Sequence, residues 1–309
     1  MNYKILKLKF KTDVHFGNGN LSDAENIIYA DTIFSAICQE YIKLYSDNLE
    51  ELVDKFRNNL IYISDTMPYI EDIYYVPKPI KRIESDRESN SVLKKAAKKL
   101  NYIPINCLGE YLKGDMEIKS EVDHFENHIG KRYSKVSVNL RNGEEAEPFR
   151  VGTYRFKESS GLYFIVAYEK KEDFELIFNC MNSIGYSGIG GKKSSGLGKF
   201  ELCDEELSEE FKKRLKSEDA HTHMLISVAL PTETEIHSVI QDANFTLIKR
   251  AGFVASQTYG NTQKKKKDLF VMKSGSCCSI VFQGDIYDVG DGEGHPVYRY
   301  AKPLFLEVE

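Results

Sequence analysis

Residues 187–202 read SGIGGKKSSGLGKFEL, and this stretch decides how the elements on either side of it are interpreted. Five of the eleven residues from 188 to 198 are glycine: Gly188, Gly190, Gly191, Gly196 and Gly198. Glycine destabilises helices and strands because its backbone loses more freedom on folding than that of any other residue. The segment is therefore predicted to be a loop, and the alternation in its last residues predicts that a β-strand follows it.

The glycine-rich loop, residues 188–198, has the composition of a phosphate-binding segment. Without a Cβ atom, glycine adopts positive φ angles and lets another molecule come within contact distance of the peptide N–H groups. Lys192, Lys193, Ser194 and Ser195 add two positive charges and two hydroxyl donors at the centre of the loop. We therefore expect it to bind phosphates, and an ordinary hairpin loop with several glycines is the alternative.

The spacing of the loop does not fit the two common nucleotide-binding motifs. A P-loop needs a glycine five residues before Gly191, where this sequence has Tyr186, and it needs Ser or Thr where the sequence has Lys193. The loop also follows a predicted helix and precedes a predicted strand, which is the reverse of the order in a P-loop or a dinucleotide-binding fold. Nucleotide hydrolysis is therefore not expected.

Hydrophobic periodicity predicts the elements around the loop. Leu6, Leu8 and Phe10 alternate with lysines and predict a strand. Asp31 is a candidate N-cap, since apolar residues recur at helical spacing behind it as far as Tyr45. The other predicted helices are 49–60, 91–100, 174–181, 204–219 (a charged helix or linker) and 233–245, and the other predicted strands are 161–168, 223–230, 269–272, 280–282 and 304–308.

The order of these elements predicts an α+β protein with two successive units, residues 1–216 and 217–309. Periodicity fades from residue 68 to 142, which suggests insertions in the first unit, covering about 68–155. A chain of 309 residues is long enough for two domains with a sizeable core.

Composition bounds the classes of function. Apolar residues make up 41% of the chain, without an apolar run long enough to cross a bilayer and without a signal-peptide pattern, so a cytoplasmic protein is expected. The six cysteines are scattered without a C-x-x-C pair, which argues against a zinc ribbon or a disulfide framework. His221 and His223 lack an evident third ligand. We therefore expect neither a metal nor a cofactor.

Basic residues are segregated although the formal net charge is −5. Residues 127–143 contain no acid and carry four cations, and residues 243–267 contain no acid and carry six. These cations are Lys131, Arg132, Lys135 and Arg141, followed by Lys249, Arg250 and the four lysines 264–267. Such a distribution predicts a basic track on an acidic body, and solvated charge on unrelated faces is the alternative.

A basic track suits single-stranded RNA when aromatic side chains lie beside it to stack on the bases. The candidates are Phe16, Tyr154, Phe156 and Phe253, each of which is alternatively a core residue. His15 is a candidate donor to a phosphate or a base, with a structural turn residue as the alternative.

Four stretches together resemble a known family. The glycine-rich loop is similar to the signature loop of the RAMP superfamily of CRISPR proteins. The stretches His15-Phe16-Gly17, ADTIFSA at 30–36 and YAKPLF at 300–305 resemble, more narrowly, the family of the fourth subunit of the type III-A effector, the Csm complex. The resemblance implies two ferredoxin-like (RRM-like) domains in tandem, with a thumb hairpin inserted in the first.

The same resemblance implies the function. Its members hold the 5′ handle of the crRNA without cleaving it, link it to the polymerase-like large subunit and contact a backbone RAMP subunit, as part of antiviral defence. Residues 127–155 would form the thumb, so that Arg150, Thr153 and Arg155 join the RNA site together with Gly17. One departure is Lys193, where several RAMP loops carry arginine, so that a point charge replaces a two-pronged contact.

An enzyme is the competing interpretation. Some RAMP relatives are metal-independent endoribonucleases that process crRNA, and such chemistry needs a general base and a group that stabilises charge on the phosphate. His15, a lysine of the loop and the hydroxyl of Tyr29 or Tyr186 are the candidates here. Nothing in the sequence fixes the distances between them, so a non-catalytic RNA-binding subunit is the preferred prediction.

Overall fold

The structure is a computed structural model that describes residues 1–17, 19–45, 48–83, 91–139, 147–215, 220–254, 264–292 and 295–309, of which 91–94 and 139 by their backbone only. Arg141 of the predicted basic run lies outside these residues. No described helix is both long enough and apolar enough to span a membrane.

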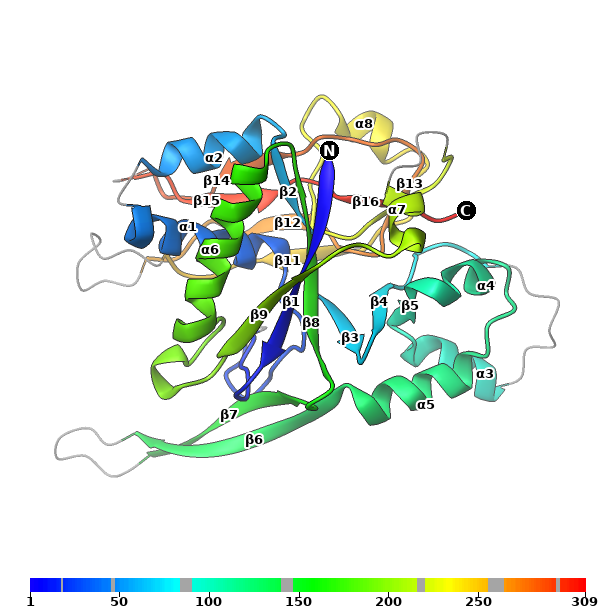
Figure 1. Ribbon diagram of the computed structural model, residues 1–309, viewed down its shortest axis with the longest axis horizontal. Coiled ribbons are helices and arrows are strands. Elements are labelled where there is room, and N and C mark those ends of the chain that lie inside the picture. Colours follow the sequence, from blue (N-terminus) through cyan, green and yellow to red (C-terminus); the bar gives the residue numbers. More distant parts are fainter. Residues whose placement is uncertain are drawn as a thin grey trace.

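An antiparallel sheet forms the centre of the N-terminal unit, in a fold of α+β type (Figure 1). Strand β1 (Asn2–Phe10) lies between β8 (Ser160–Tyr168) and β9 (Phe200–Glu205) and is antiparallel to both. The other edge of β8 pairs with β2 (Ile61–Ile63) and β3 (Met67–Ile70). The order β9-β1-β8-β2/β3 is that of a ferredoxin-like βαββαβ unit.

Three helices cover one face of this sheet: α1 (Ala30–Tyr45), α2 (Leu49–Arg57) and α6 (Lys171–Ser187). Leu6, Leu8 and Phe164 point into this layer and are fully buried, as the alternation in the first strand predicted. Ile5 and Ile165 point to the opposite face, where they pack with Phe211 of α7 (Glu209–Leu215). The middle of the sheet, around β1 and β8, is therefore buried on both faces.

The stretch predicted as an insertion begins later than expected. Strand β3 lies in the main sheet, and β4 (Ile73–Pro77) and β5 (Tyr102–Pro104) extend it, so the boundary at residue 68 is wrong. Tyr75 and Val76 are fully buried in the core, which their mixed sequence neighbourhood did not reveal.

The rest of this stretch is helical and ends in a hairpin. The predicted helix at 91–100 is confirmed as α3 (Ser91–Lys99), and η1 (Ile105–Cys107), α4 (Leu108–Leu112) and α5 (Ile118–His128) follow it. Strands β6 (Gly130–Asn139) and β7 (Glu147–Phe156) then form the predicted antiparallel hairpin, which projects from the body (Figure 1).

The C-terminal unit consists of short strands. Strand β10 (His223–Leu225) lies between β13 (Cys277–Cys278) and β16 (Phe305–Glu307). Two hairpins complete the unit: β11 (Leu247–Arg250) with β12 (Leu269–Met272), and β14 (Asp285–Asp288) with β15 (Tyr298–Ala301).

Two predictions for this unit are wrong. Residues 280–282 form no strand, and Ile280 and Val281 are 44% and 56% exposed. A helix was predicted at 233–245, but the observed helix α8 covers only Ile236–Val239. Residues 280–282 are apolar without alternation, and residues 233–245 are mostly polar, so neither segment has a continuous face to bury.

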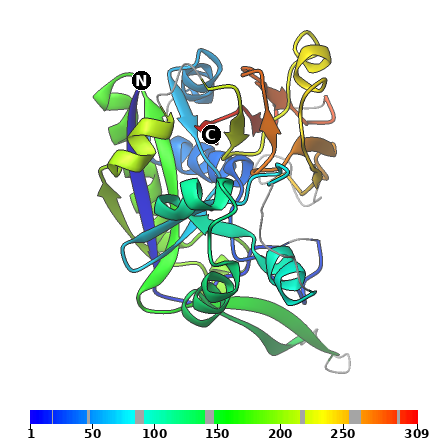
Figure 2. The same cartoon turned by 90° about the vertical axis from the view of Figure 1, so that its right-hand side faces the viewer.

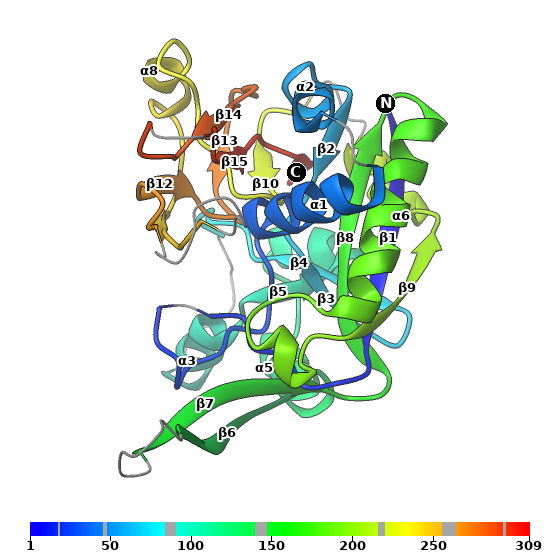
Figure 3. The ribbon, with the colours of Figure 1, turned by 90° about the vertical axis from the view of Figure 1, so that its left-hand side faces the viewer.

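Helix α1 lies between the N-terminal sheet and the C-terminal strands (Figures 2 and 3). Phe34 on α1 packs on Tyr300 of β15 with ring centroids 5.8 Å apart, and the Tyr300 hydroxyl donates to the carbonyl of Ile63 at 3.3 Å. One hydrophobic cluster thus contains residues from both units, so the core runs across residue 216.

Buried carboxylates hold the two units together. Oδ1 of Asp65 accepts hydrogen bonds from the amide of Ala30 at 2.7 Å and from the amide of Val228 at 3.0 Å. The first amide N–H of α1 is therefore bonded by Asp65 and not by Asp31. The prediction of Asp31 as N-cap is therefore wrong. Asp31 instead accepts hydrogen bonds from Arg250 and Arg299 of the C-terminal unit.

Candidate nucleic-acid interface

The glycine-rich loop folds back against the segment that follows β1. The amide of Ile189 donates to the carbonyl of Gly198 at 3.0 Å and closes the loop. Gly191 N–H donates to the carbonyl of His15 at 2.8 Å, and Gly198 N–H donates to that of Asp13 at 2.9 Å. The end of α6, the start of β9 and residues 13–16 are thereby fixed to one another.

Most of these glycines are needed because other segments of the chain lie in close contact with the loop. A Cβ on Gly190, whose φ is +95°, would come within 2.8 Å of the His15 carbonyl and of the Phe16 ring. One on Gly191 would come within 2.7 Å of the His15 ring, and one on Gly188 within 2.5 Å of the Leu197 carbonyl. Gly196, with φ +80° and open space around it, is different. Contacts within the chain therefore require glycine at 188, 190 and 191 whether or not RNA approaches the backbone there.

The centre of the loop remains free to bind a ligand. The amides of Gly190, Lys192, Lys193 and Ser194 make no hydrogen bond within the part of the chain that the structure describes. Lys193, Ser194 and Ser195 are exposed. The two lysines diverge: Lys192 has a left-handed backbone and its ammonium lies 5.3 Å from the ring centroid of Phe149 on β7.

A cleft of about 300 Å³ opens beside the loop. Its walls are residues 189–191 and Lys193 of the loop, the polar face of α1, and residues 250–253 with Lys266 from the C-terminal unit. Figure 3 shows α1 running between the C-terminal strands and α6, the helix that leads into the loop. The cleft is therefore built by three segments that are far apart in the sequence.

Lysines give the cleft its positive character. The carboxylate of Asp31 is neutralised by two guanidiniums. Arg250 donates from Nε to Oδ2 at 3.0 Å and from Nη2 to Oδ1 at 2.8 Å, and Arg299 donates to Oδ2 at 2.9 Å. Glu40 pairs with Lys43 at 2.9 Å. Among the described residues, no carboxylate forms an ion pair with Lys193 or Lys266. Burial and the neighbouring Arg299 charge lower the pKa of Lys266, so an added anion would favour its charged form.

Asp13 anchors the hairpin beside this cleft. Its carboxylate pairs with Lys135 of β6 at 2.5 Å and with Nε of Arg155 of β7 at 2.6 Å. Burial acts to raise the pKa of Asp13, but the hydrogen bonds from these two cations outweigh it and hold the pKa below its ordinary value. The hairpin is thus tied to the same segment as the glycine-rich loop.

Comparison with known proteins agrees with this geometry. The profile of the RAMP superfamily matches residues 7–201, and the profile of the CRISPR Csm4 C-terminal domain matches residues 218–308. A Mycobacterium tuberculosis protein named CRISPR system Cms protein Csm4 is 34% identical over 99% of this chain and 98% of its own length. A Streptococcus thermophilus protein of the same name is 31% identical over the full length of both chains. The chain belongs to the Csm4 family of the RAMP superfamily.

Solved structures show the same fold in other Csm4 proteins. The crystal structure of a Csm3-Csm4 subcomplex in the type III-A CRISPR-Cas interference complex has a chain that matches over 100% of both lengths, with a TM-score of 0.69 and 21% identity. A Csm1-Csm4 cassette in complex with pppApA matches over 99% of this chain and 98% of that one, with a TM-score of 0.65 and 22% identity.

Several predicted RNA contacts are buried. Phe16, Tyr154 and Phe156 are 6%, 5% and 8% exposed and pack in the core. Tyr154 and Phe156 offer no face to a base, so the prediction of stacking is wrong for these two, whereas Phe16 also lines the cleft. Thr153 is fully buried and is likewise no contact. His15 is 6% exposed, and its Nδ1 lies 2.7 Å from the Gly152 carbonyl beneath the glycine-rich loop, which is the structural alternative.

Other predicted contacts are at the surface. Lys131, Arg132 and Arg150 are exposed on the hairpin, and the Arg155 side chain is 66% exposed although it pairs with Asp13. Phe253 is 55% exposed and, like Gly17, lines the cleft.

The two cations of β11 are engaged with carboxylates. Arg250 joins the units through Asp31, and the Lys249 ammonium lies 2.7 Å from Asp268. Neither is therefore a free phosphate contact.

Two features of the site were missed from the sequence. The outer face of α1 carries Thr32, Ser35, Gln39 and Lys43 at helical spacing, and this polar stripe was the available signal. Asp13 gave no signal because its partners lie more than 120 residues away. No group of three or more metal-ligating side chains occurs in the described ranges.

Proposed function

We propose that this chain is the crRNA-binding, non-catalytic subunit of a type III-A (Csm) interference complex in antiviral defence, and that the cleft beside the glycine-rich loop holds the 5′ handle. The observation that carries the proposal is that Lys193 and Lys266, which have no carboxylate partner among the described residues, face one cleft from the two units of the fold.

Single-stranded RNA fits this surface for physical reasons. Phosphates need cations and N–H donors, and the loop offers Lys193 beside the amides of Gly190 and Ser194, which make no hydrogen bond to the described residues. Bases need an exposed aromatic face, which Phe253 offers at the opposite wall. The hairpin adds Lys131 and Arg150, which are exposed and lie outside the core.

The partners are proposed from the relatives. Solved Csm4 chains occur in a Csm3-Csm4 subcomplex and in Csm1-Csm4 cassettes. We infer that this chain contacts the corresponding backbone RAMP subunit and polymerase-like large subunit. The Csm1-Csm4 cassettes contain nucleotides such as pppApA, but the handle-binding role proposed here rests on the cleft itself.

The fold supports a matching proposal for the C-terminal unit. Its strands have the order β16-β10-β13, Ala229 next to β10 bridges Met272 of β12, and β12 pairs with β11. This is again the order of a ferredoxin-like unit, with the hairpin β14–β15 in place of the second helix. We propose that the chain carries two such units in tandem.

The endoribonuclease alternative has less support from the geometry. His15 is buried and its Nδ1 is held by Gly152, whereas Tyr186 is 78% exposed on α6. A general base must reach the proton that it abstracts. We expect the purified protein to leave a labelled repeat RNA intact with or without divalent metal. Specific cuts that disappear in His15→Ala would establish the nuclease instead.

The RNA-binding proposal is tested by the double change Lys192→Ala with Lys193→Ala. Each phosphate contact with a single strand contributes about −0.7 to the slope of log affinity against log salt. We expect weaker binding of a repeat-derived handle RNA and a slope that is flatter by about 1.4 when both contacts are lost. Fluorescence anisotropy across a salt series measures both quantities.

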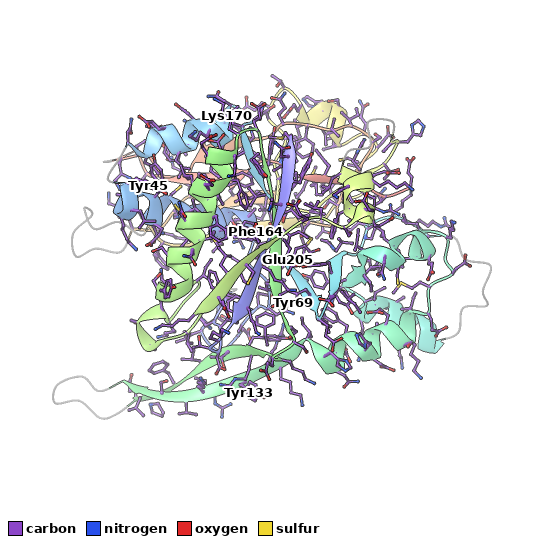
Figure 4. The ribbon with its side chains drawn as sticks, in the orientation of Figure 1. Tyr45, Tyr69, Tyr133, Phe164, Lys170 and Glu205 are labelled. Carbon is purple, nitrogen blue, oxygen red and sulfur yellow. The ribbon has the colours of Figure 1, made fainter. Side chains whose placement is uncertain are left out.

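A matched control removes two lysines at the far end of the same helix. Lys170 and Lys171 are exposed at the start of α6, and Figure 4 labels Lys170 at the end of the helix opposite the loop. The 17 residues of α6 separate the two ends by about 25 Å. The change Lys170→Ala with Lys171→Ala alters the net charge equally and should leave the slope unchanged. Equal slopes for the loop variant and the wild type, with both proteins folded, would refute the proposal.

A further inference from the structure

A second and larger cavity lies on the other side of the segment that precedes α1. Its volume is about 720 Å³, within the range of small-molecule sites. Glu25, Ile27 and Tyr29 line both this cavity and the cleft, so a single stretch of chain separates the two. The far walls are formed by residues 77–82, the C-terminal end of α3 with residues 100–102, and Thr246 with Lys273 of the C-terminal unit.

Positive charge is denser here than in the cleft. Among the described residues, six cations and one carboxylate, Glu25, line the cavity. The cations are Lys78, Lys81, Arg82, Lys98, Arg132 and Lys273. None of the six pairs with a carboxylate within the described ranges. In a chain with a net charge of −5, such a cluster is a local reversal of sign, and it favours an anionic occupant.

Two of these lysines are already oriented by the protein. Nζ of Lys78 donates to the carbonyl of Ala97 at 2.6 Å, and burial lowers the pKa of Lys78. Nζ of Lys81 lies 3.4 Å from the hydroxyl of Thr222 and from the carbonyl of Val308. The side chains of the other four cations make no hydrogen bond to the described residues, which leaves their donors free.

The remaining lining suits a nucleotide better than a simple anion. Asn26, Asn101 and Asn244 bring three amide groups, each with donor and acceptor atoms that match the edges of bases. The rings of Tyr102 and Phe125 stack with centroids 5.8 Å apart and an interplanar angle of 23°, and both line the cavity. Arg132 reaches this lining from β6, so the projecting hairpin borders the cavity too.

We propose that this cavity is a second RNA subsite, and that a single strand held in the cleft continues across Tyr29 into it. Phosphates would lie against Arg82, Lys98 and Lys273, and an unpaired base would lie among the asparagine amides. Tyr29 marks the crossing point, since its ring already stacks on the Arg250 guanidinium at 4.3 Å in the wall of the cleft. This inference rests on the proposed function, because it extends the path of the same RNA.

The test is the double change Arg82→Ala with Lys98→Ala, assayed with unstructured oligoribonucleotides of about 4 to 16 nucleotides, the range of single-strand site sizes. Both side chains are exposed, so the fold should not change. For the longer oligonucleotides we expect the plot of log affinity against log salt to be flatter by about 1.4 for the variant than for the wild type. The ratio of wild-type to variant affinity should therefore fall about sevenfold as the salt concentration rises from about 50 to about 200 mM. Oligonucleotides too short to leave the cleft should bind both proteins equally.

Lys99 and Lys113 provide the matched control. Both are exposed, neither lines the cavity or the cleft, and Lys99 pairs with Glu126 at 3.3 Å. The change Lys99→Ala with Lys113→Ala removes the same charge and should leave binding unchanged at every length.

The outcomes separate this inference from the proposed function. If Lys192→Ala with Lys193→Ala weakens binding while Arg82→Ala with Lys98→Ala binds long RNA like the wild type, RNA binding in the cleft is supported and the second subsite is refuted. An equal loss at every length would place the RNA in the cavity alone and refute the continuous path. Unchanged RNA binding together with lost assembly with purified partner subunits would identify the cavity as a protein-docking surface and also overturn the inference.

Discussion

Replacing Asp31 by asparagine distinguishes an ion-pair role from a helix-capping role. Asparagine caps helices as well as aspartate does, so a cap would survive the change almost without cost. The structure instead places two guanidiniums on this carboxylate, from Arg250 and Arg299, whose side chains are 17% and 4% exposed. Breaking a buried pair by removing one partner costs about 3–5 kcal/mol, because it leaves a buried charge uncompensated.

We therefore expect Asp31→Asn to lower the free energy of unfolding by about 3–5 kcal/mol, or the melting temperature by about 5–8 °C if the chain unfolds as one unit. Urea and thermal unfolding followed by circular dichroism measure the two quantities. Asp54→Asn on α2 is the control: its side chain is 58% exposed, it lies 3.8 Å from Arg57, and its replacement should change stability by less than about 0.5 kcal/mol. A loss below about 1 kcal/mol for Asp31→Asn would refute the ion-pair interpretation.

Three further predictions concern the loop, the hairpin and the junction of the units. Gly190→Ala should destabilise the protein more than Gly196→Ala, because both residues have positive φ but only the Cβ at 190 meets neighbouring atoms, at 2.8 Å; thermal unfolding compares them. The pKa of Asp13 is lowered in the folded state, so its contribution to stability is present above about pH 4 and is lost as the pH falls through the folded pKa. Asp13→Asn should therefore flatten the acid limb of the stability profile and speed proteolysis within the hairpin. Burial raises the pKa of Asp65 to about 7, so its contribution is present below about pH 4 and declines as the pH rises to about 7; Asp65→Asn should remove that decline in urea midpoints measured across this range.

The elements that could be predicted are those whose own sequence records which face is buried. Strand β1 alternates because Leu6 and Leu8 face the helices, and α1 repeats at helical spacing because Phe34 and Tyr41 face the sheet. The glycine-rich loop was predicted as a loop for the correct conformational reason. These signals are local, so one sequence is sufficient to find them.

What the sequence could not supply is the identity of distant partners. The need for glycine at 190 comes from His15 and Phe16, about 175 residues earlier in the chain. The charge count in the sequence likewise could not include the ion-pair partners of the cations. Arg250 belongs to a basic run in the sequence, but in the structure it pairs with Asp31. Tyr154 lies beside Arg155 in the sequence, yet it faces the core because neighbours in a strand point to opposite sides.

The same pairing explains how an acidic chain can present basic surfaces. On β1, Lys4 pairs with Asp204 at 2.9 Å and Lys7 with Glu205 at 3.3 Å, and the Lys7 ammonium also lies 4.4 Å from the ring of Tyr69, which Figure 4 labels near Glu205. Cations that are matched in this way contribute little field to their surroundings. Lys193 in the cleft and Lys98 in the cavity lack such carboxylate partners among the described residues. Counterions that RNA gathers around its phosphates are released only where unmatched cations replace them, so binding should depend on these local surfaces and not on the net charge of −5.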